Sequence, residues 1–169
     1  MFKIADPLTL TKENLLTTLP ILPSEWMVEF MFKPTNYDNP GWTSIFHMTI
    51  GGNGDNLGDR NPEVFVNPGR GLVVANSLND NADDWIDIPA PPIDEWTKIR
   101  MSQEIENGNT KVKLFINDKE MFSAVNSKPI SFENVKVYAS GTWEPAQPGS
   151  IKNLSINFIK EYYSEYYSA

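Results

Sequence analysis

The chain has 169 residues, of which 40% are hydrophobic and 12% aromatic, a composition that suits one compact domain. Its 22 acidic and 14 basic side chains give a net charge of −8, which repels phosphate backbones and anionic lipid and argues against nucleic-acid or membrane-surface partners. The sequence has no cysteine, so disulfides, thiolate metal sites and a cysteine nucleophile are excluded. The expected partner is neutral, cationic or a metal ion.

The compartment stays open. The first residues, MFKIADPLTLTKENLL, lack the basic-then-apolar order of a signal peptide, and no run approaches the roughly 20 apolar residues of a membrane span. A cytoplasmic protein fits this start, and an extracellular one fits if a leader lies outside this numbering. The sequon Asn153-Leu154-Ser155 is compatible with secretion.

Apolar and polar residues alternate with a period of two along most of the chain, which is typical of half-buried β-strands. In EWMVEFMFK, residues 25–33, the side chains of Trp26, Val28 and Phe30 fall on one face while glutamate and methionine fall on the other. Clusters of turn-forming residues separate such stretches. Strands are predicted at residues 13–19, 25–33, 42–50, 63–67, 71–77, 84–88, 95–104, 110–117, 119–125, 130–139 and 153–159.

About eleven short strands cannot bury their faces as one flat layer, so the sheet must fold into a sandwich or close into a barrel. The 13 prolines lie almost wholly between the predicted strands, because proline donates no ladder hydrogen bond. We expect an all-β fold, a single-domain antiparallel β-sandwich over residues 1–160. A Tyr-rich tail or edge strand is expected at residues 161–169.

Residues 95–125 carry a family signature. Trp96-Thr97-Lys98-Ile99 opens a strand, a turn follows at residues 106–109, and the next strand ends at Asn117-Asp118. This order resembles the W-x-x-[ILV] … [ILV]-x-[ILV]-[ND]-[GD] signature of concanavalin A-like jelly rolls, a superfamily that includes laminin-G modules, galectins, pentraxins and many glucanases. The resemblance in strand layout covers roughly residues 13–160 and implies a jelly-roll sandwich.

Within this superfamily, residues 51–85 are most similar to galectins. Asn61-Pro62 is followed, after a strand and a turn, by LVVANSLND with Asn76 and then by Trp85, which is the order of the galectin sugar site. The resemblance implies a ligand rim in which Asn61 and Asn76 lie side by side, face outward and bind sugar hydroxyls. Trp85 would then stack under the apolar face of the sugar.

Two departures limit this resemblance. Galectins place a histidine two positions before the first asparagine and an arginine two positions after it, where this chain has Asp59 and Glu63. Galactose specificity therefore does not carry over. The turn NPGRG would still make strands 63–67 and 71–77 antiparallel neighbours anchored in the core by valines, namely Val64, Val66 and Val73.

A sugar site needs flat apolar area and fixed polar groups, because buried polar atoms without partners are costly. Trp42, Trp85 and Trp143 stand in or beside turn-rich sequence, so they either contact a ligand or close the ends of the sandwich. Trp26 and Trp96 open regular strands and are expected in the core.

Two basic residues have two interpretations each. His47, the only histidine, is in phase with Ile45 on a mixed face, and it is either a polar group of a concave site or an ordinary hydrogen-bonded strand histidine. Arg60 either clamps a ligand oxygen or pairs with Asp55 or Asp59 in an acidic loop.

The acidic clusters GDNLGD and NDNADD supply oxygen atoms of the kind that calcium binds on flexible loops. Neither cluster fits the twelve-residue EF-hand loop, and a solvated acidic turn explains the composition as well. Calcium is the one cofactor that the sequence suggests. The candidate metal ligands are Asp55, Asp59, Asp80, Asp83 and Asp84.

No catalytic motif is present. The sequence lacks the E-x-D-x-x-E strand of retaining glucanases, a G-x-S-x-G nucleophile motif, a P-loop and H-E-x-x-H, so we expect no enzyme activity. The favoured hypothesis is a lectin-like module that binds a glycan or another neutral small ligand at the rim or concave face of the sandwich. Two alternatives stay open: a protein-interaction scaffold, homo-oligomeric or not, and a carrier of an apolar small molecule.

Overall fold

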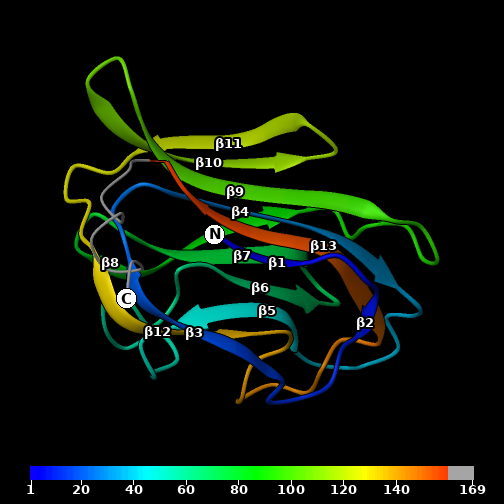
Figure 1. Cartoon of the computed structure of the whole chain (residues 1–169). Coiled ribbons are helices and arrows are strands. Elements are labelled where there is room, and N and C mark those ends of the chain that lie inside the picture. The colour runs from blue at the N-terminus through cyan, green and yellow to red at the C-terminus, as the bar shows by residue number, and fades with distance from the viewer. Residues whose placement is uncertain (160–169) are drawn as a thin grey trace.

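The computed structural model describes residues 1–159, which form two β-sheets packed face to face (Figure 1). The described residues contain no helix. In chain order, the strands are β1 (Phe2–Ile4), β2 (Leu8–Thr9), β3 (Leu15–Leu22), β4 (Trp26–Pro34), β5 (Thr43–Thr49), β6 (Glu63–Asn67), β7 (Gly71–Leu78), β8 (Asn81–Ile88), β9 (Thr97–Glu106), β10 (Asn109–Ile116), β11 (Lys119–Val125), β12 (Phe132–Tyr138) and β13 (Gly149–Phe158).

The sheets differ in strand order. Sheet A has the order β1-β13-β4-β9-β10-β11, with β2 also paired to β13, and sheet B has the order β3-β12-β5-β6-β7-β8. All pairs of named strands are antiparallel. The antiparallel β-sandwich predicted from the period-two pattern is therefore confirmed.

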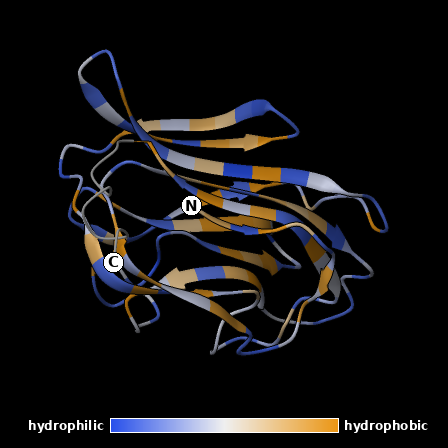
Figure 2. Ribbon diagram, in the orientation of Figure 1, coloured by the Kyte–Doolittle hydropathy of each residue, from blue (hydrophilic) through white to orange (hydrophobic). Residues whose placement is uncertain are grey.

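The core lies between the sheets. Along β4, buried and partly buried residues alternate without interruption, and Trp26, Val28 and Phe30 are each no more than 3% exposed. Sheet B contributes residues such as Phe46 and Val74 to the same cluster. Hydrophobic and hydrophilic residues alternate along the strands of both sheets in Figure 2. Removal of this apolar area from water, about 25 cal/mol per Å², is the main force that holds the sheets together.

Several strand limits differ from the prediction. The first two strands were missed, because segments of two and three residues show too little alternation to be recognised. Strand β8 begins at Asn81 and β13 at Gly149, each a few residues earlier than expected. The predicted tail at 161–169 lies outside the described residues. No helix in the described part of the chain is long and apolar enough to span a membrane.

A β-bulge in β5 corrects the expected phase of this strand. The pairing of β5 with β6 shifts between Ser44 and Phe46, so that Ile45 and Phe46 both join the core cluster. His47 is therefore not in phase with Ile45, as the sequence suggested. It pairs with Glu63 on the outer face of sheet B, the face turned away from the core.

The hairpin of β6 and β7 forms as predicted around the turn NPGRG. Val64 and Val66 point into the core, also as expected. Val73 instead packs on the outer face with Phe65 and Ala75, in a second, smaller apolar cluster that includes Trp42 and Trp85. The strands of this hairpin are thus apolar on both faces, which shows that the outer face carries more than solvated side chains.

Candidate functional site

The outer face of sheet B is organised as two cross-strand rows. Register pairs align His47 with Glu63, Glu63 with Ala75, and Ala75 with Trp85, across β5 to β8. A second row aligns Ser44, Phe65, Val73 and Asp87 in the same way. Because directly opposed residues in antiparallel strands project to the same face, these rows bring polar groups of β5 and β6 beside aromatic and acidic groups of β6 and β8.

Three aromatic rings meet on this face. The Trp42 ring lies edge-to-face on Trp85, with centroids 5.1 Å apart, and on Phe65, with centroids 5.6 Å apart. Phe65 and Trp85 are stacked at 6.2 Å with an interplanar angle of 17°. Such pairs lie within the range of favourable aromatic contacts. Phe65 is buried, whereas Trp42 and Trp85 keep part of their rings at the surface.

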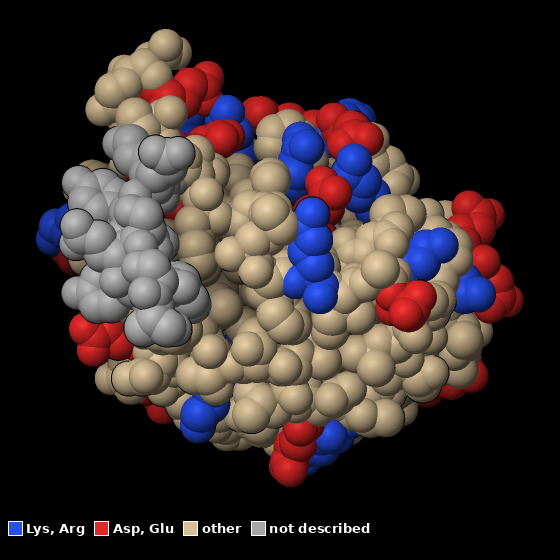
Figure 3. All heavy atoms as spheres, in the orientation of Figure 1, with Lys and Arg blue, Asp and Glu red and all other residues tan. Residues whose placement is uncertain are grey.

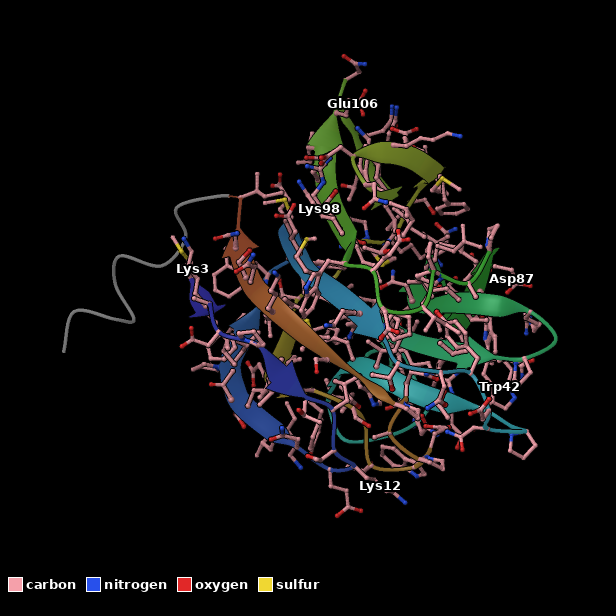
Figure 4. All side chains as sticks on the ribbon, turned by 90° about the vertical axis from the view of Figure 1, so that its right-hand side faces the viewer. Lys3, Lys12, Trp42, Asp87, Lys98 and Glu106 are labelled. Carbon is pink, nitrogen blue, oxygen red and sulfur yellow. The ribbon has the colours of Figure 1, made fainter. Side chains whose placement is uncertain are left out.

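A surface ion pair lies against the two tryptophans. Arg70, in the turn before β7, donates from Nε to Asp87 Oδ2 at 2.9 Å, and its Nη2 lies 2.8 Å from Asp87 Oδ1. The guanidinium is 4.8 Å from the Trp85 centroid and 5.6 Å from that of Trp42. We call Trp42, Phe65, Arg70, Trp85 and Asp87 together the aromatic patch. Figure 4 shows Trp42 and Asp87 on the same side of the molecule.

Beside the patch, Arg60 holds two carboxylates. Its Nε donates to Glu63 Oε2 at 2.9 Å, its Nη1 donates to Asp83 Oδ1, and its Nη2 donates to the Asn53 main-chain oxygen at 3.2 Å. The guanidinium carbon also lies 5.2 Å from the Trp85 centroid. Arg60 is therefore enclosed between the aromatic patch and its acidic partners, and Asp83, not the expected Asp55 or Asp59, is the aspartate that it binds.

His47 and Glu63 are both 0% exposed, and burial shifts the pKa of each. His47 Nε2 lies 2.7 Å from the Asp59 main-chain oxygen, so Nε2 carries the proton and donates it there. Burial lowers the pKa of His47 to about 4. Burial raises the pKa of Glu63 well above its usual range, against the opposing effect of Arg60. Both shifts favour the uncharged form of a buried side chain.

The segment that follows β12 covers this buried pair. Trp143 is 45% exposed and its ring lies 6.0 Å from that of His47, edge-to-face. A Cβ atom at Gly141 would lie 3.1 Å from His47 Nδ1 and 3.3 Å from Glu63 Oε1, so the main chain at this position packs closely on both side chains. The segment therefore shields His47 and Glu63 and leaves Trp143 at the surface.

The two asparagines of the galectin-like motif lie elsewhere. Asn76 follows Ala75 on β7 and so faces the opposite side of sheet B from Trp85. It is 3% exposed, as is Asn61, and each amide donates to a main-chain oxygen, of Ser77 and Gly58 respectively. Both line a small hollow at the end of the core together with Trp26. The expected outward pair of amides next to Trp85 is thus not formed.

Three of the five proposed calcium ligands, Asp59, Asp80 and Asp83, are held by other partners. Asp59 Oδ2 accepts hydrogen bonds from the main-chain N–H groups of Asp55 and Asn56 at 3.1 and 2.9 Å, which closes the acidic loop. Asp83 binds Arg60, and Asp80 pairs with Lys128. Asp84 lies opposite Asn76 in the ladder. Within residues 1–159, no three acidic or histidine side chains come together as a metal site would require.

Trp26 is in the core, as expected, but Trp96 is not part of it. The Trp96 ring is partly buried beside two lysines, with Lys152 Nζ at 4.2 Å and Lys33 Nζ at 5.3 Å from its centroid. It precedes β9 in sheet A, away from the aromatic patch.

Sequence reasoning missed Phe65, Arg70 and Asp87 as members of the patch. One signal was available, since Asp87 stands two positions after Trp85 and strand alternation places both on one face. No local signal reveals the pairing of Arg70 with Asp87, because it depends on the register of β7 and β8. Of the six predicted ligand residues, the structure brings together His47, Arg60, Trp85 and Trp143 near the outer face of sheet B.

The fold is similar to that of several solved structures. The CBM40 domain of the Ruminococcus gnavus IT-sialidase, solved bound to α2,3-sialyllactose, aligns with 93% of this chain and 95% of its own, at 12% identity and a TM-score of 0.53. The botulinum neurotoxin type G receptor-binding domain aligns with 91% of this chain and 43% of its own, at 12% identity and a TM-score of 0.55. The family 7 alginate lyase A1-II′ aligns with 79% and 62%, at 9% identity and a TM-score of 0.51.

These similarities show the fold, a jelly-roll β-sandwich shared by carbohydrate-binding domains. The set contains a lyase as well as non-catalytic domains, so the fold alone does not decide between binding and catalysis. No protein-family model and no curated sequence matches the chain.

Proposed function

We propose that this protein is a non-catalytic carbohydrate-binding module that binds a glycan at the aromatic patch. The observation that carries the proposal is the combination of Trp42 and Trp85 at the surface with the fixed ion pair of Arg70 and Asp87. The rings offer apolar area to the C–H face of a sugar, and the ion pair offers donors and acceptors to its hydroxyls. Structural neighbours solved with sialyllactose support a glycan as the ligand.

The burial of His47 and Glu63 supports a binding function rather than catalysis. These two residues carry the shifted pKa values that acid–base chemistry uses, but both side chains are 0% exposed. A general acid or base must come within hydrogen-bonding distance of the substrate. Enclosed beneath the segment around Gly141, they stabilise the fold of the outer face and do not contact a ligand.

The alternative of an apolar carrier has less support. The apolar hollow lined by Leu72, Ile88 and the prolines at 89, 91 and 92 has a volume of about 230 Å³. Pockets for small-molecule ligands usually enclose roughly 300–1,000 Å³. The scaffold alternative predicts self-association or protein capture without glycan binding. The following experiment tests glycan binding and so distinguishes this alternative from the proposed function.

The test is a glycan array with the parent protein, followed by titration of the strongest hit into two variants. Trp85→Ala removes the central ring of the patch and should weaken binding at least about tenfold. Trp96→Ala is the matched control, because it removes a partly buried tryptophan that also lies beside two basic residues, but in sheet A. Equal binding by parent and Trp85→Ala, with both folded by circular dichroism, would place the site elsewhere, and Trp143 would be the next candidate.

A further inference from the structure

We infer that the aromatic patch selects neutral sugars and discriminates against carboxylated ones. The inference rests on the proposed function, since it names the class of glycan that the same site accepts. The inference concerns the charge of the ligand, and its evidence is the set of ion pairs around the tryptophans.

Both cations that lie against the rings of the patch are already neutralised. Arg70 presents Nε and Nη2 to the two carboxylate oxygens of Asp87, which is the bidentate geometry that guanidinium groups form with carboxylates. Arg60 is bound to Glu63 and Asp83. Among the interactions of residues 1–159, these are the cations within reach of the Trp85 ring, and neither presents its charge unpaired to a ligand.

A carboxylated sugar would have to compete with an acid of the protein. To bind Arg70, its carboxylate must displace Asp87, which then remains next to the ligand as a like charge. Arg60 offers no second route, because its side chain is only 7% exposed and its acidic partners are held by the fold. The net charge of −8 adds a repulsive field of the same sign.

A neutral sugar can bind without displacing Asp87 from Arg70. Each sugar hydroxyl is both a donor and an acceptor, so neighbouring hydroxyls can donate to Asp87 and accept from Arg70 without breaking the pair. The exposed fractions of these side chains, 38% for Arg70 and 45% for Asp87, leave both within reach of a ligand. The pair lies directly against Trp42 and Trp85, so one ligand can contact rings and ions together. This preference would separate the protein from structural neighbours that were solved with sialyllactose.

The test is a glycan array that carries neutral oligosaccharides beside carboxylated counterparts, with lactose and α2,3-sialyllactose as one matched pair. Titration of the strongest pair then compares the parent with Asp87→Asn, which frees the Arg70 guanidinium. We expect the parent to bind the neutral member at least about tenfold more tightly. In Asp87→Asn, we expect the carboxylated member to gain at least about fivefold relative to the neutral one.

The control variant is Asp118→Asn. It changes the net charge by the same amount, but Asp118 pairs with Lys98 at 2.8 Å in sheet A, away from the patch. It should leave the preference as in the parent. Tighter binding of the carboxylated member by the parent, or an equal shift in both variants, would overturn the charge preference while leaving glycan binding intact. Absence of binding to every glycan would overturn this inference and the proposed function together.

Discussion

At the scale of single residues, burial shifts the pKa values of His47 and Glu63 in opposite directions. The folded pKa of His47, about 4, lies below its unfolded value near 6.5, so its contribution to stability is lost as the pH falls from 6.5 to 4. The folded pKa of Glu63 is raised, so its contribution is present below about pH 4.5 and is lost as the pH rises through the folded pKa. Between about pH 4.5 and 6.5, the change in unfolding free energy due to His47 therefore opposes the change due to Glu63.

Single substitutions should therefore reveal the pH dependence of stability that each of the two residues contributes. Glu63→Gln keeps only the His47 effect, so its unfolding free energy should fall on acidification from pH 6.5 to 4, by about 3 kcal/mol if the His47 shift is fully expressed and more steeply than that of the parent. His47→Gln should instead become relatively less stable as the pH rises above 4.5. Urea unfolding at a series of pH values measures both effects, and the double variant is the control, because it lacks both titrating groups. Parallel curves for parent and single variants would show that the pair is not buried as described.

At the scale of elements, the turn between β6 and β7 sets the position of Arg70. Gly71 has a φ of +86°, and a Cβ atom there would lie 2.5 Å from the Ile88 main-chain oxygen. An L-residue is therefore both strained and obstructed at this position. The main chain of β7 thus approaches the end of β8 closely at Gly71, next to Arg70, whose side chain reaches Asp87.

Gly71→Ala should cost about 3 kcal/mol of unfolding free energy and should weaken glycan binding because Arg70 shifts. Gly69→Ala is the control in the same turn, since its added Cβ would be 3.4 Å from Asn67 Oδ1, an ordinary contact. We expect that variant to stay within about 0.5 kcal/mol of the parent. Chemical denaturation of both variants makes the comparison, and equal losses in the two would contradict the special requirement for glycine at position 71.

At the scale of the whole molecule, the fold follows from local pattern and the site does not. Alternation along β4 and proline placement predicted the sandwich, because each strand must bury one face. The bulge in β5 left no comparable signal, and it decides which side chains share a face with His47. The motif with Asn61 and Asn76 matched galectins in order only, and the ladder of β7 turns Asn76 inward.

The pairing of charged side chains could not be predicted from the sequence either. The net charge of −8 correctly indicates an acidic molecule, but the sequence gives no view of which charges are paired. On the face drawn in Figure 3, basic and acidic side chains intermix near β9 and β10, where Lys98 pairs with Asp118 and Lys113 with Glu106. The pairing of Arg70 with Asp87 is likewise a property of strand register, and so is the ligand charge that we infer from it.

The most direct test of the central claim, that the outer face of sheet B binds glycan, is to record the five tryptophan indole N–H signals by NMR during titration with the strongest array hit. Each signal is assigned by a single Trp→Phe variant. We expect the signals of Trp42 and Trp85 to shift with a common dissociation constant, while those of Trp26, in the core, and Trp96, in sheet A, stay in place. Saturable shifts of Trp96 with Trp42 and Trp85 unchanged would contradict the claim.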